Sequence, residues 1–247
     1  MGADNTGRAR GVLLAGGAGT RLLPLTRTVN KHLLPVGQKP MIYHAIERLV
    51  EAGIDEILVV TGVEHMGDLV NQLRSGRELG CALTYRVQEE ARGIADALAL
   101  ARGFSRGAPM VVVLGDNIFE DNLRPWLDRY LGCGRQAMVL LKEVSDPERF
   151  GCPRLEDGRI MEIIEKPAKP PSNMAVTGIY FYGEEVFDII AGLRPSARGE
   201  LEISDVNNTY LRRGELEHGV LRGYWTDAGT HESLARAGRL VSGARDP

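Results

Sequence analysis

The sequence predicts an α/β fold with an open, mostly parallel sheet and helices on both faces. Short apolar runs typical of buried strands alternate along the chain with segments that carry apolar residues at helical spacing. Glycine or aspartate follows several of these runs directly, as in Leu14-Ala15-Gly16 and Leu114-Gly115-Asp116. Parallel strands need crossover helices, and ligands of such sheets bind beyond the carboxyl ends of the strands. We therefore expect a binding site at one sheet edge.

The first part of the chain carries the clearest alternation. Apolar residues in 40–52 recur at the spacing of an amphipathic helix, with Pro40 at the start and Gly53 after the end. Residues 110–114 are all apolar and predict a buried strand. The same patterns predict helices over 64–73 and 93–101 and strands over 12–14, 56–60 and 83–87.

After Asn122 the pattern changes. Residues 146–151 predict a turn, and the prolines within 166–171 exclude both helix and strand there. The expected strands are 137–141, 159–164, 175–182 and 216–224, and the expected helices are 123–131, 184–190, 203–211 and a terminal helix from Thr230. We expect a flexible segment over residues 1–10 and a single domain over 11–247, whose two halves are 11–121 and 122–247.

A glycine-rich loop follows the first strand and predicts a phosphate-binding site. Because glycine lacks a Cβ atom, the backbone N–H groups of such a loop can close around an anion. Thr20 adds a hydroxyl, and Arg21 and Lys31 add positive charge suited to phosphate oxygens. A glycine turn beside a solvated arginine explains the residue types equally well. The loop consists of Gly16, Gly17 and Gly19, which come after Leu14.

This loop belongs to neither of the two common phosphate-binding types. A P-loop requires Gly-Lys-Ser/Thr after its last glycine, whereas Gly19 is followed by Thr20 and Arg21. A dinucleotide-binding loop requires a third glycine, and Leu22 occupies that position. The missing glycine also argues against a dinucleotide-dependent oxidoreductase.

Three motifs indicate a family. Leu14-Ala-Gly-Gly-Ala-Gly-Thr-Arg-Leu22, Lys31-His-Leu-Leu-Pro35 and Lys39-Pro-Met-Ile42 resemble the signature of sugar-nucleotide pyrophosphorylases, with the short form of glucose-1-phosphate thymidylyltransferase as the best match. The resemblance implies a Rossmann-like nucleotidyltransferase fold of the glycosyltransferase-A type and a homo-oligomer, either a dimer or a tetramer. It assigns nucleotide binding to residues 11–121 and sugar-phosphate binding to 122–247. Long forms of the family have a C-terminal extension that helps form a regulatory site, so we expect feedback inhibition to be weak or differently built.

By this resemblance the glycine loop binds a nucleoside triphosphate, with dTTP favoured. The implied nucleotide contacts are Leu14, Gly16, Gly17, Gly19, Thr20, Arg21, Lys31, Gln88, Gly93 and Asp116. Gln88 and Gly93 match the pair that reads the base, although a surface glutamine at the start of a loop is a common alternative. His32 replaces a glutamine of the long forms, and Arg92 and Asp96 lie where they could alter the choice of base.

Two aspartates match the Mg²⁺ ligands of the family. Asp116 follows the most apolar strand, and Asp227 lies in the motif Trp225-Thr-Asp-Ala-Gly-Thr230. Carboxylates at the mouth of a sheet suit a hard cation that arrives with phosphates. Each aspartate taken alone also suits a turn or a helix cap. The resemblance implies that the two hold one Mg²⁺ together.

The Glu165-Lys166-Pro167 segment matches a sugar-phosphate element of the family. The resemblance implies that Lys166 contacts the phosphate and Glu165 the sugar hydroxyls, whereas the residue types alone suggest a solvated ion pair. Arg198 has two open interpretations, a phosphate contact or a structural ion pair with Glu200 or Glu202. The remaining implied sugar-phosphate contacts are Asn117, Gly151, Val176 and Thr177.

The implied reaction transfers a nucleoside monophosphate from dTTP to glucose 1-phosphate, giving dTDP-glucose and pyrophosphate. A phosphate oxygen is already anionic near pH 7 and needs no general base. The implied catalytic groups position the substrates and stabilise charge, and they are Arg21, Lys31, Asp116, Lys166 and Asp227. Two alternatives stay open. One is the same chemistry with UTP, CTP or GTP, or with another sugar, cyclitol or phosphonate acceptor, and the other is a catalytically silent regulatory subunit.

Composition limits the partners of the chain. The net charge of −3 gives no basic field that would recruit nucleic acid, and no apolar run approaches the roughly 20 residues of a membrane span. Cys81, Cys133 and Cys152 show no metal or redox spacing, which favours free thiols in a reducing cytosol. We therefore expect a cytoplasmic protein whose partners are small phosphates and other copies of itself.

Overall fold

The structure, a computed structural model, describes residues 8–243. They form an α/β fold that divides into two compact units, and the chain passes between the units several times. Unit 1 contains residues 8–9, 92–112 and 125–222, and unit 2 contains residues 10–91, 113–124 and 223–243. The predicted flexible segment over 1–10 falls mostly outside the described residues, and the first strand already begins at Arg10.

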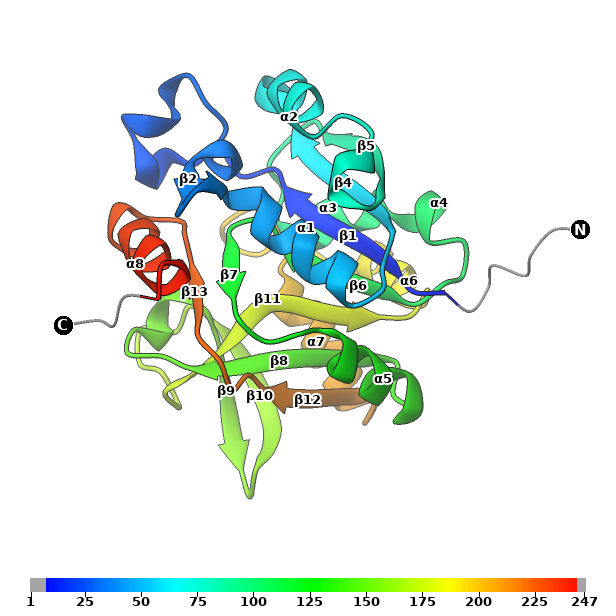
Figure 1. Cartoon of the computed structure of the whole chain (residues 1–247). Coiled ribbons are helices and arrows are strands. Elements are labelled where there is room, and N and C mark those ends of the chain that lie inside the picture. The colour runs from blue at the N-terminus through cyan, green and yellow to red at the C-terminus, as the bar shows by residue number, and fades with distance from the viewer. Residues whose placement is uncertain (1–7, 244–247) are drawn as a thin grey trace, which may run out of the picture. The chain divides into compact units, whose positions relative to one another are not determined.

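A parallel ladder of three strands organises unit 2 (Figure 1). Strands β1 (Arg10–Ala15), β4 (Glu56–Gly62) and β5 (Ala82–Gln88) pair in this order, with Gly62 opposite Gln88 at their carboxyl ends. The apolar residues of β1 and β4 are buried, as expected for strands covered on both faces, whereas those of β5 are partly exposed. The helices of this stretch are α1 (Met41–Glu51), which buries its apolar stripe, and α2 (Met66–Leu73).

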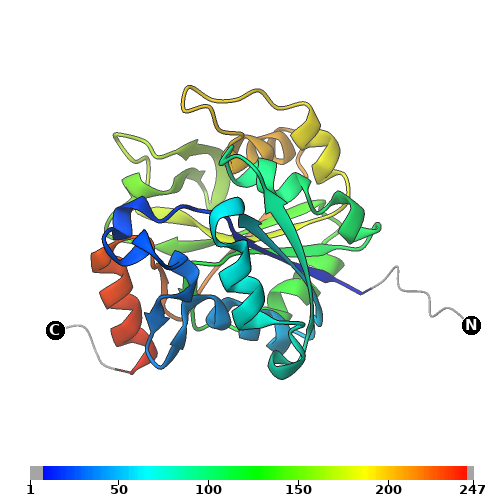
Figure 2. The same cartoon turned by 90° about the horizontal axis from the view of Figure 1, so that it is seen from above.

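The rest of unit 2 brings the end of the chain back to the glycine loop. β7 (Asn117–Phe119) pairs antiparallel with β13 (Trp225–Asp227), and α8 (His231–Val241) follows β13 directly. Helix α8, red in Figures 1 and 2, lies beside the blue segment that contains the short hairpin β2 (Pro35–Val36) and β3 (Lys39–Pro40). A buried apolar cluster joins these elements and includes Leu22, Val36, Met41, Ile118 and Ala237.

Unit 1 contains a mixed set of strands. β12 (Leu216–Val220) and β8 (Ala137–Glu143) are parallel, whereas β8 with β11 (Met174–Tyr182), β11 with β9 (Gly151–Glu156) and β9 with β10 (Arg159–Glu165) are antiparallel. β6 (Met110–Leu114) runs from unit 1 into unit 2, and α5 (Arg124–Gly132) starts at the crossing back. The other helices are α3 (Ile94–Ala99), α4 (Arg102–Ser105), α6 (Val186–Ala191) and α7 (Ile203–Arg212), and single 3₁₀ turns lie at Thr20–Leu22, Leu25–Arg27, Lys31–Leu33, Val63–His65, Arg77–Leu79 and Pro147–Arg149.

The structure confirms the predicted α/β class and most elements. The short strands β2, β3 and β7 were not expected, and two further differences lie in the second half. The strand expected over 216–224 stops at Val220, and Trp225 starts a separate strand in unit 2. Strand β9 was not expected. It pairs antiparallel with β10, and the turn residues Asp157 and Gly158 between the two strands adopt the positive φ angles of 48° and 73° that a tight hairpin turn requires. No helix within residues 8–243 is long and apolar enough to cross a membrane.

Candidate active site

The glycine loop packs against residues from three other segments of unit 2. Gly115 N donates a hydrogen bond of 2.8 Å to the carbonyl of Leu14, the residue before the loop region. A Cβ atom at Gly16 would lie 3.1 Å from Gln88 Oε1, and one at Gly17 would lie 3.2 Å from Lys31 Nζ. The loop, Gln88 and Lys31 therefore gather at one edge of the parallel ladder. Gln88 is buried there, so the alternative of a surface glutamine is wrong.

Asp116 forms a short ion pair with Lys31. Lys31 Nζ lies 2.6 Å from Asp116 Oδ2, and both side chains are largely buried, with exposed fractions of 11% and 14%. Burial by itself raises the pKa of Asp116, but the Lys31 ammonium and hydrogen bonds from Lys31 and Asn117 hold the pKa well below its ordinary value. Asp116 is therefore a fixed anion throughout the neutral pH range.

Asn117 forms a hydrogen bond to the other carboxylate oxygen of Asp116. Its Nδ2 donates to Asp116 Oδ1 at 3.1 Å, and its Oδ1 accepts from Trp225 Nε1 at 2.7 Å. Asn117 also lies directly opposite Asp227 in the β7–β13 pair. The structure thus places this residue in unit 2, where it orients an aspartate, while the other implied sugar-phosphate contacts lie in unit 1.

Asp227, Arg21 and Asp116 converge around Gly229. A Cβ atom at Gly229 would lie 2.9 Å from Asp227 Oδ2, 3.1 Å from Arg21 Nη2 and 3.7 Å from Asp116 Oδ2. Glycine therefore keeps a small space open between two carboxylates and a guanidinium. Within residues 8–243 no cluster of three or more His, Cys, Asp or Glu side chains could hold a metal. Two carboxylates fit Mg²⁺, since this ion commonly takes one or two protein carboxylates and fills its other positions with phosphate oxygens and water.

His32 is a buried residue beneath this site that the sequence did not explain. Its side chain is almost fully enclosed, and its Nδ1 and backbone N both donate to Asn30 Oδ1, at 2.8 and 2.9 Å. A Cβ atom at Gly115 would lie 2.8 Å from His32 Cδ2. Burial, followed by the charge of Lys31, lowers the pKa of His32 to about 3, against a raising effect of Asp116. His32 is therefore a neutral packing partner of the turn that carries Asp116.

In unit 1, three implied sugar-phosphate residues line up across neighbouring strands. Val176 of β11 lies opposite Gly151 of β9, and Gly151 lies opposite Glu165 of β10. Thr177 is fully buried and donates its hydroxyl proton to the carbonyl of Leu140 at 2.8 Å, where the β8–β11 register shifts. The first three residues thus lie on adjacent strands, while the Thr177 hydroxyl supports the neighbouring strand.

Lys166 adopts an unusual backbone conformation at the end of β10. Its φ angle is +44°, which is uncommon for a residue other than glycine. A hydrogen bond of 3.0 Å from its N–H to the carbonyl of Phe150 holds it there, and its side chain is half exposed. Non-glycine residues in such conformations are concentrated at functional sites.

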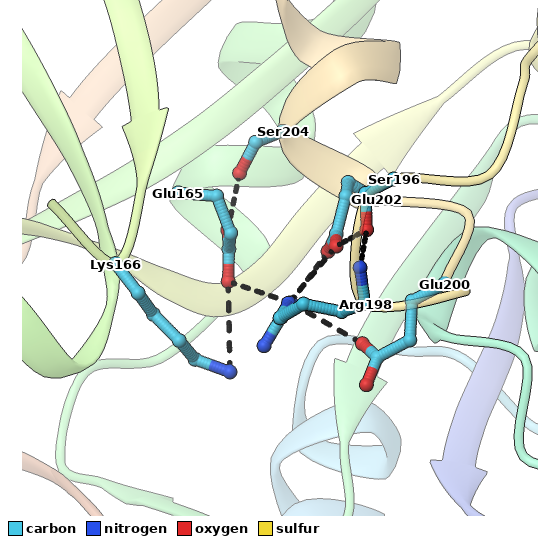
Figure 3. A network of polar contacts seen from close by, with 7 residues as sticks. All are labelled: Glu165, Lys166, Ser196, Arg198, Glu200, Glu202 and Ser204. Atoms are coloured by element: carbon cyan, nitrogen blue, oxygen red, sulfur yellow. Dashed lines mark hydrogen bonds and ion pairs between the residues drawn. The ribbon is translucent and has the colours of Figure 1, made fainter.

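Arg198 forms a structural ion pair, one of its two predicted alternatives (Figure 3). Its Nε and Nη2 donate to the two oxygens of Glu202 at 3.1 and 2.7 Å, and Nη2 lies 3.3 Å from Glu200 Oε2. Ser196 Oγ also donates to Glu202 Oε1 at 2.6 Å. Burial raises the pKa of Glu202, yet the bonds from Arg198 and Ser196 lower it overall. The loop before α7 is therefore closed on itself by a bidentate pair.

Gly93 belongs to unit 1 and packs against the same loop. It has a φ angle of +99°, and a Cβ atom there would lie 2.6 Å from the carbonyl oxygen of Leu201. Neighbouring Arg92 accepts a hydrogen bond of 2.7 Å from Leu201 N through its backbone carbonyl. Gln88 lies in unit 2, so the joint reading of a base by Gln88 and Gly93 stays a prediction.

The family follows from comparison with known proteins. The profile of the nucleotidyl transferase family matches residues 10–242, nearly the whole chain. The chain belongs to the nucleotidyl transferase family. This confirms the recognition drawn from the glycine loop and the Lys31 motif.

Two curated relatives of this nucleotidyl transferase carry the same name. A glucose-1-phosphate thymidylyltransferase of Xanthomonas campestris pv. campestris is 44% identical over 236 residues, covering 94% of this chain and 80% of the relative. The glucose-1-phosphate thymidylyltransferase of Neisseria meningitidis is also 44% identical, with 94% and 82% covered.

Solved structures share the fold. A Bacillus anthracis protein assigned as a glucose-1-phosphate thymidylyltransferase, crystallised with sucrose, is 52% identical with a TM-score of 0.92, covering 97% of this chain and 98% of that one. A UDP-glucose pyrophosphorylase in complex with UDP-glucose is 27% identical with a TM-score of 0.82, covering 96% and 100%. The open, mixed and mostly parallel sheet is thus that of sugar-nucleotide-forming nucleotidyltransferases.

Proposed function

We propose that this nucleotidyl transferase makes dTDP-glucose and pyrophosphate from dTTP and glucose 1-phosphate. The observation that carries the proposal is the convergence of Asp116, Asp227 and Arg21 around Gly229, with Lys31 paired to Asp116. Two anions and two cations beside a glycine loop suit a triphosphate and its metal ion. The name of these two curated relatives supports thymine as the base and glucose 1-phosphate as the acceptor.

The proposed reaction is a direct displacement at phosphorus. A phosphate oxygen of glucose 1-phosphate forms a bond to the α-phosphorus of dTTP, and the bond from that phosphorus to the bridging oxygen breaks. The electron pair leaves with pyrophosphate, so atoms and charge balance without a proton transfer. The main task of the protein is then to orient both substrates and to stabilise the charge that develops.

The two units hold different parts of the proposed machinery. In unit 2, Lys31 and Arg21 bind phosphates of the triphosphate, and Asp116 with Asp227 would hold Mg²⁺. When bound, this ion neutralises phosphate charge and lowers the barrier to displacement. In unit 1, Lys166 binds the phosphate of the sugar, and Glu165 accepts hydrogen bonds from its hydroxyls.

A pyrophosphate-release panel tests the proposed function. We expect dTTP to be the best nucleotide with glucose 1-phosphate, and UTP to be tolerated, because the thymine methyl contributes only about 1–3 kcal/mol. CTP, GTP and ATP should be roughly 10⁴-fold poorer in kcat/KM, because a wrong base edge leaves buried polar groups unpaired. Preference for another triphosphate or another acceptor would change the substrates and keep the chemistry. No release with any pair would favour the regulatory subunit.

The same panel tests the role of Gln88. The amide offers one donor and one acceptor, which match the N3–H and O4 of thymine or uracil. We expect Gln88→Ala to lower kcat/KM for dTTP and to reduce its advantage over CTP. Glu89→Ala, which changes the exposed next residue, is the control. An unchanged ranking and unchanged rates in Gln88→Ala would remove Gln88 from base reading.

Lys166→Ala should affect the sugar phosphate selectively. Loss of a charged hydrogen bond to phosphate should weaken glucose 1-phosphate binding by roughly 10- to 100-fold and leave dTTP binding close to that of the wild type. Calorimetry with each ligand measures this, and Lys169→Ala in the same proline-rich segment is the matched control. Equal losses for both ligands would contradict the assignment.

We also propose a cytoplasmic homo-oligomer, either a dimer or a tetramer. The three free cysteines suit a reducing compartment, and the proposed substrates are cytoplasmic metabolites. Sedimentation equilibrium of the full chain tests the oligomeric state.

A further inference from the structure

Helix α7 holds the strand end that carries Glu165 and Lys166. Asn208 Oδ1 accepts a hydrogen bond of 2.9 Å from Ile163 N, and Asn208 Nδ2 donates one of 2.7 Å to Ile163 O. Ser204 lies one helical turn earlier on the same face and donates to Glu165 Oε2 at 2.5 Å. Helix α7 thus forms hydrogen bonds to β10 at two positions, the backbone of Ile163 and the side chain of Glu165.

The two oxygens of Glu165 have different surroundings (Figure 3). Oε2 points to Ser204, which is buried with 4% of its surface exposed. Oε1 faces two cations, with Arg198 Nη2 at 3.6 Å and Lys166 Nζ at 3.8 Å. Because one oxygen is anchored inside the protein, the plane of the carboxylate is set and the other oxygen faces the cationic side.

Gly151 leaves room for the bond between Ser204 and Glu165. A Cβ atom at Gly151 would lie 3.1 Å from Ser204 Oγ and 3.5 Å from Glu165 Oε2. The φ angle of Gly151 is not in the left-handed region, so space and not backbone conformation is what glycine supplies here. Strand, hairpin partner and helix therefore all contribute to the anchoring of one carboxylate oxygen.

We propose that Ser204 is a positioning residue that sets which sugar hydroxyl Glu165 recognises. The inference rests on the proposed function, in which Glu165 accepts hydrogen bonds from the acceptor sugar. A glutamate that turns freely can follow a hydroxyl of either configuration, whereas one held at Oε2 favours a single direction. Ser204 therefore contributes to acceptor specificity without touching the reacting phosphates.

The test compares Ser204→Ala with Asn208→Ala, which removes the two hydrogen bonds between α7 and the Ile163 backbone of β10. We expect Ser204→Ala to raise KM for glucose 1-phosphate roughly tenfold, the scale of a hydrogen bond to a charged group, with KM for dTTP unchanged. The preference for glucose 1-phosphate over galactose 1-phosphate should shrink in Ser204→Ala and persist in Asn208→Ala. A purely structural bond would change both variants alike.

Deoxyglucose 1-phosphates identify the hydroxyl concerned. The analogue that lacks the hydroxyl read by Glu165 should be used equally well by the wild type, by Glu165→Gln and by Ser204→Ala. With the other analogues, Ser204→Ala should show the same roughly tenfold rise in KM relative to the wild type. Equal losses with every analogue would overturn the proposal, because the serine would then act on the whole site and not through Glu165.

Two isosteric variants keep the test independent of packing. Ser204→Thr retains a hydroxyl, and Ser204→Val has the shape of the threonine variant without a hydroxyl. We expect the threonine variant to keep the sugar preference and the valine variant to lose it, while equal behaviour of the two would refute a role of the hydroxyl. If the wild type transfers to no sugar phosphate, the proposed function fails and this inference with it. If it transfers and Ser204→Ala matches the wild type, the inference alone fails.

Discussion

Asp116→Asn and Asp227→Asn are each expected to lower kcat by roughly 10²–10³, the scale of losing one preorganised electrostatic group. Asparagine keeps the size of the side chain and removes its charge. Both carboxylates face the same space at Gly229, with Asp227 Oδ2 and Asp116 Oδ2 at 2.9 and 3.7 Å from a Cβ atom placed there. The two residues should therefore act through one bound ion.

The double variant separates a shared ion from two independent roles. Its loss should be much smaller than the product of the single losses, because removal of either ligand already weakens the same ion. Full additivity would show that the aspartates do not share a metal. Asp121→Asn is the matched control, since Asp121 lies nearby in the chain and accepts a backbone hydrogen bond from Gly223 N at 2.9 Å. We expect wild-type kcat in this control, with Mn²⁺ titration as a second measurement for all variants.

Mild acid is expected to destabilise the protein through His32. Burial lowers the pKa of this ring to about 3, whereas an unfolded histidine has a pKa near 6.5. As the pH falls below about 6.5, the unfolded chain binds a proton that the folded chain does not. The stabilising contribution is therefore complete above this pH and is lost by roughly 1.4 kcal/mol per pH unit as the pH falls toward about 3.

Urea unfolding at pH 7.5 and pH 5 measures this effect. Between these values the wild type should lose roughly 2 kcal/mol more unfolding free energy than His32→Gln, which does not titrate. The pKa of Asp116 is also depressed, but its contribution is lost only at more acidic pH. Burial lowers the pKa of His44 and His218 as well, and both proteins retain these residues, so the difference between the wild type and His32→Gln reports His32. His231→Gln at an exposed position is the control. Equal losses in the wild type and His32→Gln would show that His32 is not the acid-sensitive group.

The elements with a regular apolar pattern were predictable from the sequence. Helix α1 and strand β6 appear where periodicity placed them, because burial of one helical stripe or of a whole strand dictates the residue types. Short strands such as β7 and β13 escaped prediction. Three residues carry too little pattern, and their pairing joins positions about a hundred residues apart in the chain.

The candidate site also contains residues that could be predicted from the sequence and residues that could not. The glycine loop, Lys31 and Asp116 could be identified because their residue types follow from phosphate chemistry and match a family motif. The partners of Asn117 and Thr177 could not be identified from the sequence, and for Arg198 the sequence left two alternatives open. An amide, a hydroxyl or a guanidinium can serve a ligand or the protein itself, and only its neighbours in space decide which.

The α/β class, the family and the residues available for phosphate chemistry could be read from the amino-acid sequence, because these depend on local pattern and residue type. The folded structure was needed to show that Gly229 opens a space between two aspartates, that His32 is neutral beneath Asp116, and that Ser204 anchors Glu165. Each of these depends on desolvation or on distances of a few ångströms between segments far apart in the chain. Such contacts form only when the whole chain packs, so no local pattern encodes them.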